Sequence, residues 1–253
     1  MALIENDDKF YMSSDYSSSE PSIKSAISYF IGMLSAYAIA EKEYKIPYLY
    51  HLKDPVISRI VNPSKYFPDF FGLGYGSIND AYLIEAKGSW KDSISNESIF
   101  KAKKQLKSIG QLIFNDSSGN YHYITRFRRH ITGSYFQDDE LKFCDVDPES
   151  VGNLEYYFDA NLAIQAYYQN IMLLLQSGES HVRVVNGIKY HLVDFEGYTV
   201  GLNEFVFNKL QNRSEITGLY DSIYRRVVET YDSNIEFLKE ESISLGRDGI
   251  IVL

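Results

Sequence analysis

The sequence predicts a mixed α/β fold, in which helices pack on a mixed sheet. Apolar residues recur at helical spacing within residues 20–42, and a second helical pattern begins after Ser95. Between these two patterns lie short apolar runs, separated by the glycine, asparagine and aspartate residues that favour turns. Because helical patterns flank a run of strand patterns, we expect an α/β fold of the α+β kind with a mixed sheet.

The composition indicates a globular protein with a substantial core. The chain has 253 residues, 45 % apolar and 15 % aromatic, which fits one large domain or a core with an appended unit. Cys144 is the only cysteine, so no intrachain disulfide is possible, and a reducing compartment fits. Histidine and cysteine are too sparse for a zinc site of the usual spacing.

The N-terminal residues 1–19 are acidic and serine-rich, which predicts a flexible segment rather than a secretory signal. Residues 25–40 carry no charge, but this stretch is shorter than the roughly 20 apolar residues that span a membrane. We therefore expect a buried helix, no membrane association and a cytoplasmic location.

The first half of the chain predicts the order helix, three strands, helix, strand. Ser19, Glu20 and Pro21 are typical of a helix start, and this helix should run to about Lys42. Within it the apolar residues recur at helical spacing: Ile23, Ile27, Phe30, Leu34 and Ala38. Strands are expected at residues 45–52, 66–73 and 81–87. The second helix should bury Ile99, Ala102, Leu106, Ile109 and Ile113, and a turn at 115–120 should lead to a strand at 121–131.

The second half gives weaker signals. A strand at 141–146 should end at Asp147-Pro148, which marks a boundary between a core at 20–147 and a C-terminal α/β extension at 148–253. The extension predicts a long helix at 154–175, a strand or hairpin around Asn186-Gly187, a helix at 216–238 and a final short strand. It either stands apart or packs on the core as one domain.

Three charged residues predict a metal-assisted site. Glu85 and Lys87 are two positions apart on an expected strand, so their side chains should project from the same face. Pairing this strand with the one before it would bring Asp69 beside them. Two carboxylates and an ammonium group suit a hard cation with a base or charge stabiliser beside its bound water. The alternative is a salt bridge on an edge strand, although charges within an apolar run are costly to leave unpaired.

Pro68-Asp69, Glu85-Ala86-Lys87 and the following basic helix with Gln105 resemble the PD-(D/E)xK nuclease superfamily, over residues 20 to 131 or so. The resemblance implies a restriction-endonuclease-like core in αβββαβ order. It also implies that Asp69, Glu85 and the Ala86 carbonyl bind Mg²⁺, with Mn²⁺ as a substitute. Lys87 would orient or deprotonate water, or offset charge in the transition state.

The resemblance also suggests supporting residues. A third carboxylate often comes from the first helix, and a helix antiparallel to the first strand would place Glu20, rather than Glu41, near Asp69. Gln105 matches a site-supporting polar position, and Lys101 lies one turn earlier on the same helix side. The alternative for Glu20 is a first-turn acid favoured by the helix dipole. The histidines at positions 51, 122 and 130 are interpreted as strand or loop residues.

Positive charge is concentrated next to the predicted site, although the whole chain has a net charge of −9. Such a local excess favours phosphate binding, and a solvated helix face is the alternative interpretation. The expected nucleic-acid contacts are Lys91, Lys101, Lys103, Lys104, Arg126 and Arg128.

These expectations amount to a metal-dependent endonuclease, a hydrolase acting on DNA rather than RNA. A setting in bacterial defence or mobile-element biology is suggested only by the kind of protein it resembles. One alternative is an inactive restriction-endonuclease-like module that binds nucleic acid or protein. Another is an interaction protein that works through its tyrosine-rich C-terminal part. A homo-oligomer or a protein partner is left open.

Overall fold

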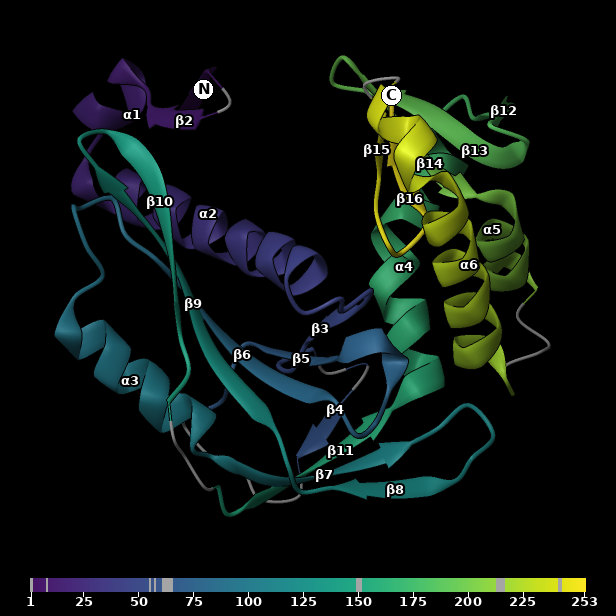
Figure 1. Ribbon diagram of the computed structural model, residues 1–253, viewed down its shortest axis with the longest axis horizontal. Helices are drawn as coiled ribbons and strands as arrows, with labels where there is room; N and C mark the ends of the chain where they lie inside the picture. The colour runs from purple at the N-terminus through teal and green to yellow at the C-terminus, as the bar shows by residue number, and fades with distance from the viewer. Residues whose placement is uncertain are drawn as a thin grey trace.

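The structure is a computed structural model that describes residues 2–7, 9–54, 56, 58–60, 66–148, 152–212, 217–240 and 243–253. It has a mixed α/β architecture in which a curled, mixed sheet is covered by helices (Figure 1). The largest sheet has the strand order β1 (Leu3–Asn6), β2 (Lys9–Met12), β10 (Glu140–Val146), β9 (Arg128–Gln137), β6 (Ala81–Gly88), β5 (Phe70–Leu73) and β3 (Leu49–His51).

Two smaller sheets complete the described strands. The first contains β4 (Ser58–Ile60), β11 (Leu154–Asp159), β7 (Ile109–Asn115) and β8 (Tyr121–Ile124). The second contains β12 (His181–Val185), β13 (Ile188–Phe195), β14 (Tyr198–Asn203), β16 (Ile250–Val252) and β15 (Ser244–Leu245). The helices are α1 (Ser14–Ser18), α2 (Pro21–Lys42), α3 (Asn96–Leu106), α4 (Ala160–Ser177), α5 (Glu204–Gln211) and α6 (Leu219–Glu240), with a 3₁₀ turn at Gly74–Gly76.

Strand β6 is an interior strand of the largest sheet, and it lies between α2 and α3 (Figure 1). It pairs antiparallel with β5 and parallel with β9. The register pairs Phe70 with Ile84, so Asp69, one residue earlier, lies opposite Glu85. Side chains alternate along a strand; therefore Ile84 faces α2 and Glu85 faces the other side, toward α3.

Helix α2 packs on β6 through small residues. A Cβ atom added at Gly32 would lie 2.7 Å from the Gly88 nitrogen, and one added at Gly88 would lie 1.7 Å from the Ser28 carbonyl oxygen. Such close backbone approach requires glycine. The buried side of the helix is Ser28, Ile31, Gly32, Ser35, Ala36 and Ala40.

The apolar stripe predicted for this helix is therefore not its buried face. The exposed fractions of Ile23, Phe30 and Leu34 are 48 %, 64 % and 69 %. Helical periodicity identifies an apolar face, whereas close packing on β6 selected the face with the smallest side chains. Helix α2 is long and apolar enough to cross a membrane, but core helices of soluble proteins have the same length and composition. A third of the most apolar part of α2 is buried inside the protein.

Several element boundaries differ from the sequence predictions. Helix α3 ends at Leu106, so Ile109 and Ile113, expected on its buried stripe, lie in β7. Residues 121–131 form β8 and the start of β9 rather than one strand, and residues 154–159 form β11 before α4 begins. Strand β7 pairs parallel with β11. A short apolar run does not distinguish a buried strand from a buried helix segment, and the parallel pairing decided the outcome here.

The element order begins as expected, with α2, β3, β5, β6 and α3, but the next strand does not join the first sheet. β7 lies in the four-stranded sheet, and the parallel neighbour of β6 is β9, which comes later in the chain. β4 also lies in the four-stranded sheet. The mixed α/β class is thus established, in an arrangement where β7 and β8 intervene between α3 and β9.

Both ends of the chain are integrated with the sheets. Residues 3–18, within the segment expected to be flexible, include β1, β2 and α1, and β2 pairs with β10. The hairpin predicted at Asn186-Gly187 joins β12 to β13, with φ values of 45° and 78° that suit a tight turn. The last predicted helix appears as α6; Ile216, its expected first residue, lies outside the described residues.

One hydrophobic cluster joins the two halves of the chain. It includes Phe71 and Leu83 from the largest sheet, Leu112 from β7, and Tyr168 and Ile223 from α4 and α6. The described part of 148–253 therefore packs on the preceding part through a shared core.

Candidate active site

Asp69, Glu85 and Lys87, the three charged residues predicted to form the site, converge near the end of β6. Asp69 immediately precedes β5, and Glu85 and Lys87 lie on the same face of β6. The Asp69 backbone N–H donates a hydrogen bond to Glu85 Oε2 at 3.1 Å, and the Ala86 N–H donates to Asp69 Oδ2 at 3.1 Å. Each carboxylate is thus held by the backbone of the other residue's strand. Their exposed fractions are 5 % for Asp69 and 1 % for Glu85.

Two ammonium groups occupy the remaining carboxylate oxygens. Lys87 Nζ donates a hydrogen bond to Glu85 Oε1, and Lys53 Nζ lies 3.0 Å from Asp69 Oδ1. Lys53 was not predicted as a site residue. It follows β3, whose pairing with β5 places it beside Asp69. The only signal in the sequence was a lysine shortly after an expected strand, and the sequence does not fix the register of that strand.

Gln105 links Lys87 to the segment before Asp69. Its Nε2 donates a hydrogen bond to the Phe67 carbonyl oxygen at 2.9 Å, and its Oε1 accepts one from Lys87 Nζ at 3.4 Å. Helix α3 presents this amide because Ser95 caps its first turn, accepting from the Ser98 N–H, and Ala102 anchors the helix in the core. The structure thus places Gln105 where it can orient Lys87.

The electrostatics of the site favour a cation. Burial raises the pKa of the Glu85 carboxyl to about 8, the Asp69 charge raises it further toward that value, and Lys87 and Lys53 partly oppose the shift. Burial opposes the charged form of Lys53, but the Asp69 carboxylate, with smaller contributions from Glu85 and Tyr29, raises the pKa of Lys53 above its ordinary value. Glu85 therefore holds a proton near neutral pH unless additional positive charge arrives.

The donor set fits Mg²⁺ or Mn²⁺. Carboxylate oxygens are hard ligands. In Asp69 and in Glu85 one oxygen is fixed by a backbone N–H, and the other already contacts a cationic side chain. The two ammonium groups thus mark where positive charge is stabilised. In the described part of the chain, no cluster of three or more His, Cys, Asp or Glu residues forms a metal site. If such an ion binds here, Asp69, Glu85 and the Ala86 carbonyl are the groups that would hold it.

Glu20 is not brought to this site. It is exposed at the start of α2, eight residues before Ser28, the residue whose carbonyl lies against Gly88. At a rise of about 1.5 Å per residue, that separation is roughly 12 Å along the helix. Glu41, the alternative, lies in the last turn of α2 and accepts a hydrogen bond from the Arg247 backbone N–H at 2.9 Å. The sheet separates α2 from the face that carries Glu85.

The basic residues expected to contact nucleic acid lie in different parts of the structure. Lys101, Lys103 and Lys104 are exposed on α3, and Lys101 lies one turn before Gln105 with an ion pair to Glu97 at 2.6 Å. Lys91 is also exposed, near the end of β6, and Arg126 is exposed in the segment between β8 and β9.

Arg128 does not lie beside the site. It pairs with Tyr82 at the opposite end of β6 and contacts Asp80 at 3.0 Å, on the face opposite Glu85. A run of basic residues in the sequence does not reveal which of them share a surface.

The histidines have distinct surroundings. His122 contacts Asp116 at 2.8 Å, and His130 contacts Asp145 at 3.0 Å and Tyr44 at 2.9 Å. These pairings suit structural residues. His51 instead lies next to the Lys53–Asp69 pair, where burial lowers its pKa and the Asp69 charge partly opposes the shift.

Comparisons of the chain with protein-family models, with curated proteins and with solved structures found no match.

Proposed function

We propose that this protein is a metal-dependent nuclease that hydrolyses phosphodiester bonds, with DNA as the preferred substrate, on a variant of the restriction-endonuclease-like core. The observation that supports it best is the convergence of Asp69, Glu85 and Lys87, three residues chosen from a sequence motif, at one buried position.

The residues divide the work between binding and activation. When bound by Asp69, Glu85 and the Ala86 carbonyl, Mg²⁺ supplies charge that polarises a phosphate oxygen and acidifies water. Lys87 orients or deprotonates the attacking water, or offsets charge on the transition state. Gln105 keeps the Lys87 ammonium in place, and Lys53 keeps positive charge beside Asp69.

The exposed lysines of α3 and Lys91 support phosphate binding. They lie on the helix that carries Gln105 and near the end of β6, so a phosphodiester at the site would pass close to them. The Arg128 side chain is not part of this proposed contact surface.

The experiment is a cleavage assay on plasmid, linear duplex and single-stranded DNA and on RNA, with Mg²⁺, Mn²⁺ or EDTA. Cleavage should require the metal. Lys87→Ala should lower the cleavage rate by at least about a hundredfold, because general acid–base groups contribute about 10²–10⁴-fold. Its metal binding and fold should be retained. Lys42→Ala, a lysine in the last turn of α2, is the matched control and should cleave normally. Normal Mg²⁺-dependent cleavage by Lys87→Ala would refute the assignment.

A second candidate is a non-catalytic binding module. All four carboxylate oxygens of Asp69 and Glu85 already have protein partners, which is what a purely structural network would show. In that case the wild-type protein would bind nucleic acid without cleaving it under any metal condition, and binding would not change in Lys87→Ala.

A further inference from the structure

A cavity of about 380 Å³ lies between α2, β3 and α4. Its lining includes Tyr37 from α2, Tyr50 and His51 from β3, and Tyr167 and Asn170 from α4. Its volume is at the small end of the range for small-molecule sites. The chemistry proposed above does not use any of these residues.

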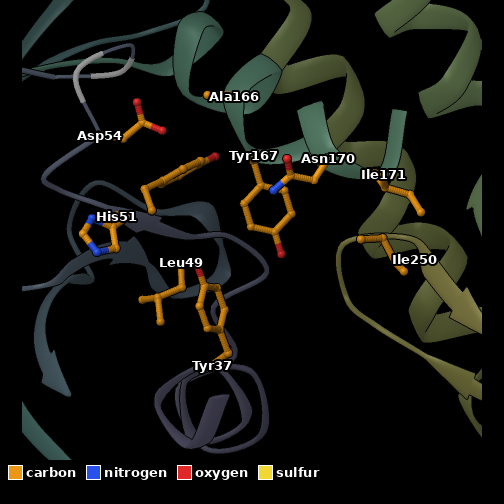
Figure 2. Close-up of a pocket in the computed structure, with 10 residues that line it drawn as sticks. Tyr37, Leu49, His51, Asp54, Ala166, Tyr167, Asn170, Ile171 and Ile250 are labelled. Atoms are coloured by element: carbon orange, nitrogen blue, oxygen red, sulfur yellow. The ribbon is translucent and has the colours of Figure 1, made fainter. Parts of the chain in front are cut away.

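Tyrosine rings lie among the aliphatic and polar side chains that line the cavity. Figure 2 shows Tyr37 projecting from α2 and Tyr167 from α4 into the same space, with the Asn170 amide beside Tyr167. Both rings are held in place. Tyr37 packs edge-on against Phe70 with centroids 5.1 Å apart, and the Tyr167 hydroxyl donates a hydrogen bond to Asp248 at 2.8 Å. Flat π surfaces on fixed elements suit a planar ring.

Polar groups accompany these aromatic surfaces. The His51 Nδ1 accepts a hydrogen bond from the Lys53 backbone N–H at 3.2 Å, which leaves Nε2–H as the donor of the neutral ring. Asn170 is exposed and carries both a donor and an acceptor. The Tyr50 hydroxyl is buried and has no hydrogen-bond partner among the described residues. By contrast, the hydroxyls of Tyr48 and Tyr168 are both paired.

The cavity adjoins the candidate active site. His51 is a lining residue, and Lys53, two residues later, contacts Asp69 Oδ1 at 3.0 Å. The Leu52 backbone N–H between them donates to the Asp69 carbonyl oxygen at 2.8 Å. A strand with its phosphate near Asp69 and Glu85 would therefore bring an adjacent base to the mouth of the cavity.

We propose that this cavity receives a nucleobase of the strand bound at the Asp69–Glu85 site. The proposal rests on the proposed nuclease function and specifies its substrate: a strand with unpaired bases, as in single-stranded DNA or at frayed and flapped ends. The base stacks on tyrosine, and its edge meets Asn170 and His51. A base within a duplex would first have to leave its stack, at a free-energy cost that single strands avoid.

The test uses single-stranded oligonucleotides with one 2-aminopurine at successive positions, bound to the full-length protein in EDTA. Stacking on an aromatic ring quenches this fluorophore, so quenching should appear at one position near the later cleavage point. The same oligonucleotides are then cleaved with Mg²⁺. The first readout reports base capture without the metal, and the second reports the nuclease activity.

Variants assign the quenching to the cavity. Tyr37→Ala should weaken single-strand binding roughly tenfold, the usual scale for loss of one base–aromatic stack, and raise KM more than it lowers kcat. Tyr37→Phe keeps the ring and should restore both. Asn170→Ala changes an exposed helix position and should weaken binding without unfolding the protein. Tyr123→Ala, an exposed tyrosine on β8, is the control and should behave as wild type.

The outcomes separate this proposal from the one it rests on. Two results would overturn the base-binding cavity and leave the nuclease proposal standing. In the first, cleavage requires the metal but no position is quenched. In the second, cleavage requires the metal but Tyr37→Ala and Asn170→Ala both bind normally. Quenching that Tyr37→Ala abolishes, without cleavage under any metal condition, overturns the nuclease and supports the cavity as a binding site. Equal cleavage of blunt duplex and single strands also contradicts the proposal.

Discussion

The Glu85 carboxyl is 1 % exposed, lies beside a second carboxylate and contacts a lysine. Burial is the main cause of its raised pKa, and the Asp69 charge adds to it. In the folded protein near neutral pH the group keeps a proton that the unfolded chain would release. The same residue is therefore a source of instability at high pH and a position where a cation is favoured.

This difference predicts a pH-dependent stability. Protonated Glu85 stabilises the folded state relative to the unfolded chain. This stabilisation is fully present at pH values below the ordinary pKa of a glutamate, and it is lost as the pH rises toward about 8. The free energy of unfolding in EDTA should thus fall between about pH 5 and pH 8, by a few kcal/mol at most. Glu85→Gln cannot titrate and should remove this slope, as measured by urea unfolding across the pH range. An unchanged slope in the variant would show that another group titrates.

The proton at Glu85 should also compete with a metal ion. Mg²⁺ should raise Tm more at pH 8 than at pH 6, because at the higher pH the ion displaces less bound proton. Differential scanning fluorimetry with and without Mg²⁺ measures this effect. Asp69→Asn keeps an oxygen that can accept the Ala86 N–H but loses the charge, so it should abolish the Mg²⁺ effect while the fold is retained. A Tm shift that persists in this variant would place the ion elsewhere.

At the scale of elements, the position of α2 depends on two glycines. Gly32 on the helix and Gly88 on β6 let the two backbones approach closely, and this contact fixes the helix on the sheet face opposite Glu85. The sequence correctly predicts the helix and its start at Pro21, since the capping and N1 signals are local. It does not predict which side is buried, because an apolar stripe and a stripe of small residues compete and only the shape of β6 chooses between them.

Substituting Gly88 tests this packing. In Gly88→Ala the new methyl group would meet the Ser28 carbonyl at 1.7 Å, so the helix must shift away from β6. The free energy of unfolding should drop by at least about 2 kcal/mol, as for other overpacked contacts. Thermal unfolding should show Tm lowered by roughly 5 °C or more, given the usual 2–4 °C per kcal/mol for a chain of this size. Ser22→Ala, on the exposed side of α2, is the control. A variant as stable as wild type would mean that the helix tolerates a looser position.

At the scale of the whole molecule, the two halves of the chain share one core. The parallel pair β7–β11 joins them, and residues from α4 and α6 pack against residues from the largest sheet. The sequence places a boundary at Pro148 because Asp147-Pro148 ends a strand, and β10 does end at Val146. A strand end is a local event, however, whereas a domain boundary requires that few contacts cross it.

Truncation after Asp147 tests the shared core. The fragment would lose the partner strand of β7 and would expose core residues such as Leu112 and Phe71. We expect it to lack a cooperative thermal transition, by circular dichroism and calorimetry, and to associate in gel filtration. A fragment that unfolds cooperatively as a monomer would instead define 20–147 as an independent domain.

The sequence by itself determined the features that depend on neighbouring residues. Alternation along β6 puts Glu85 and Lys87 on one face, Ser95 caps α3, and Asn186-Gly187 adopts the positive φ values that its hairpin needs. Only the tertiary structure decided that Lys53 contacts Asp69, that Glu20 lies away from the site, and that Tyr37, Tyr50 and Tyr167 share a cavity. These features join segments up to about 130 residues apart, and they depend on strand register and on the close packing of backbones. Residue periodicity encodes neither of these, because it describes one segment at a time.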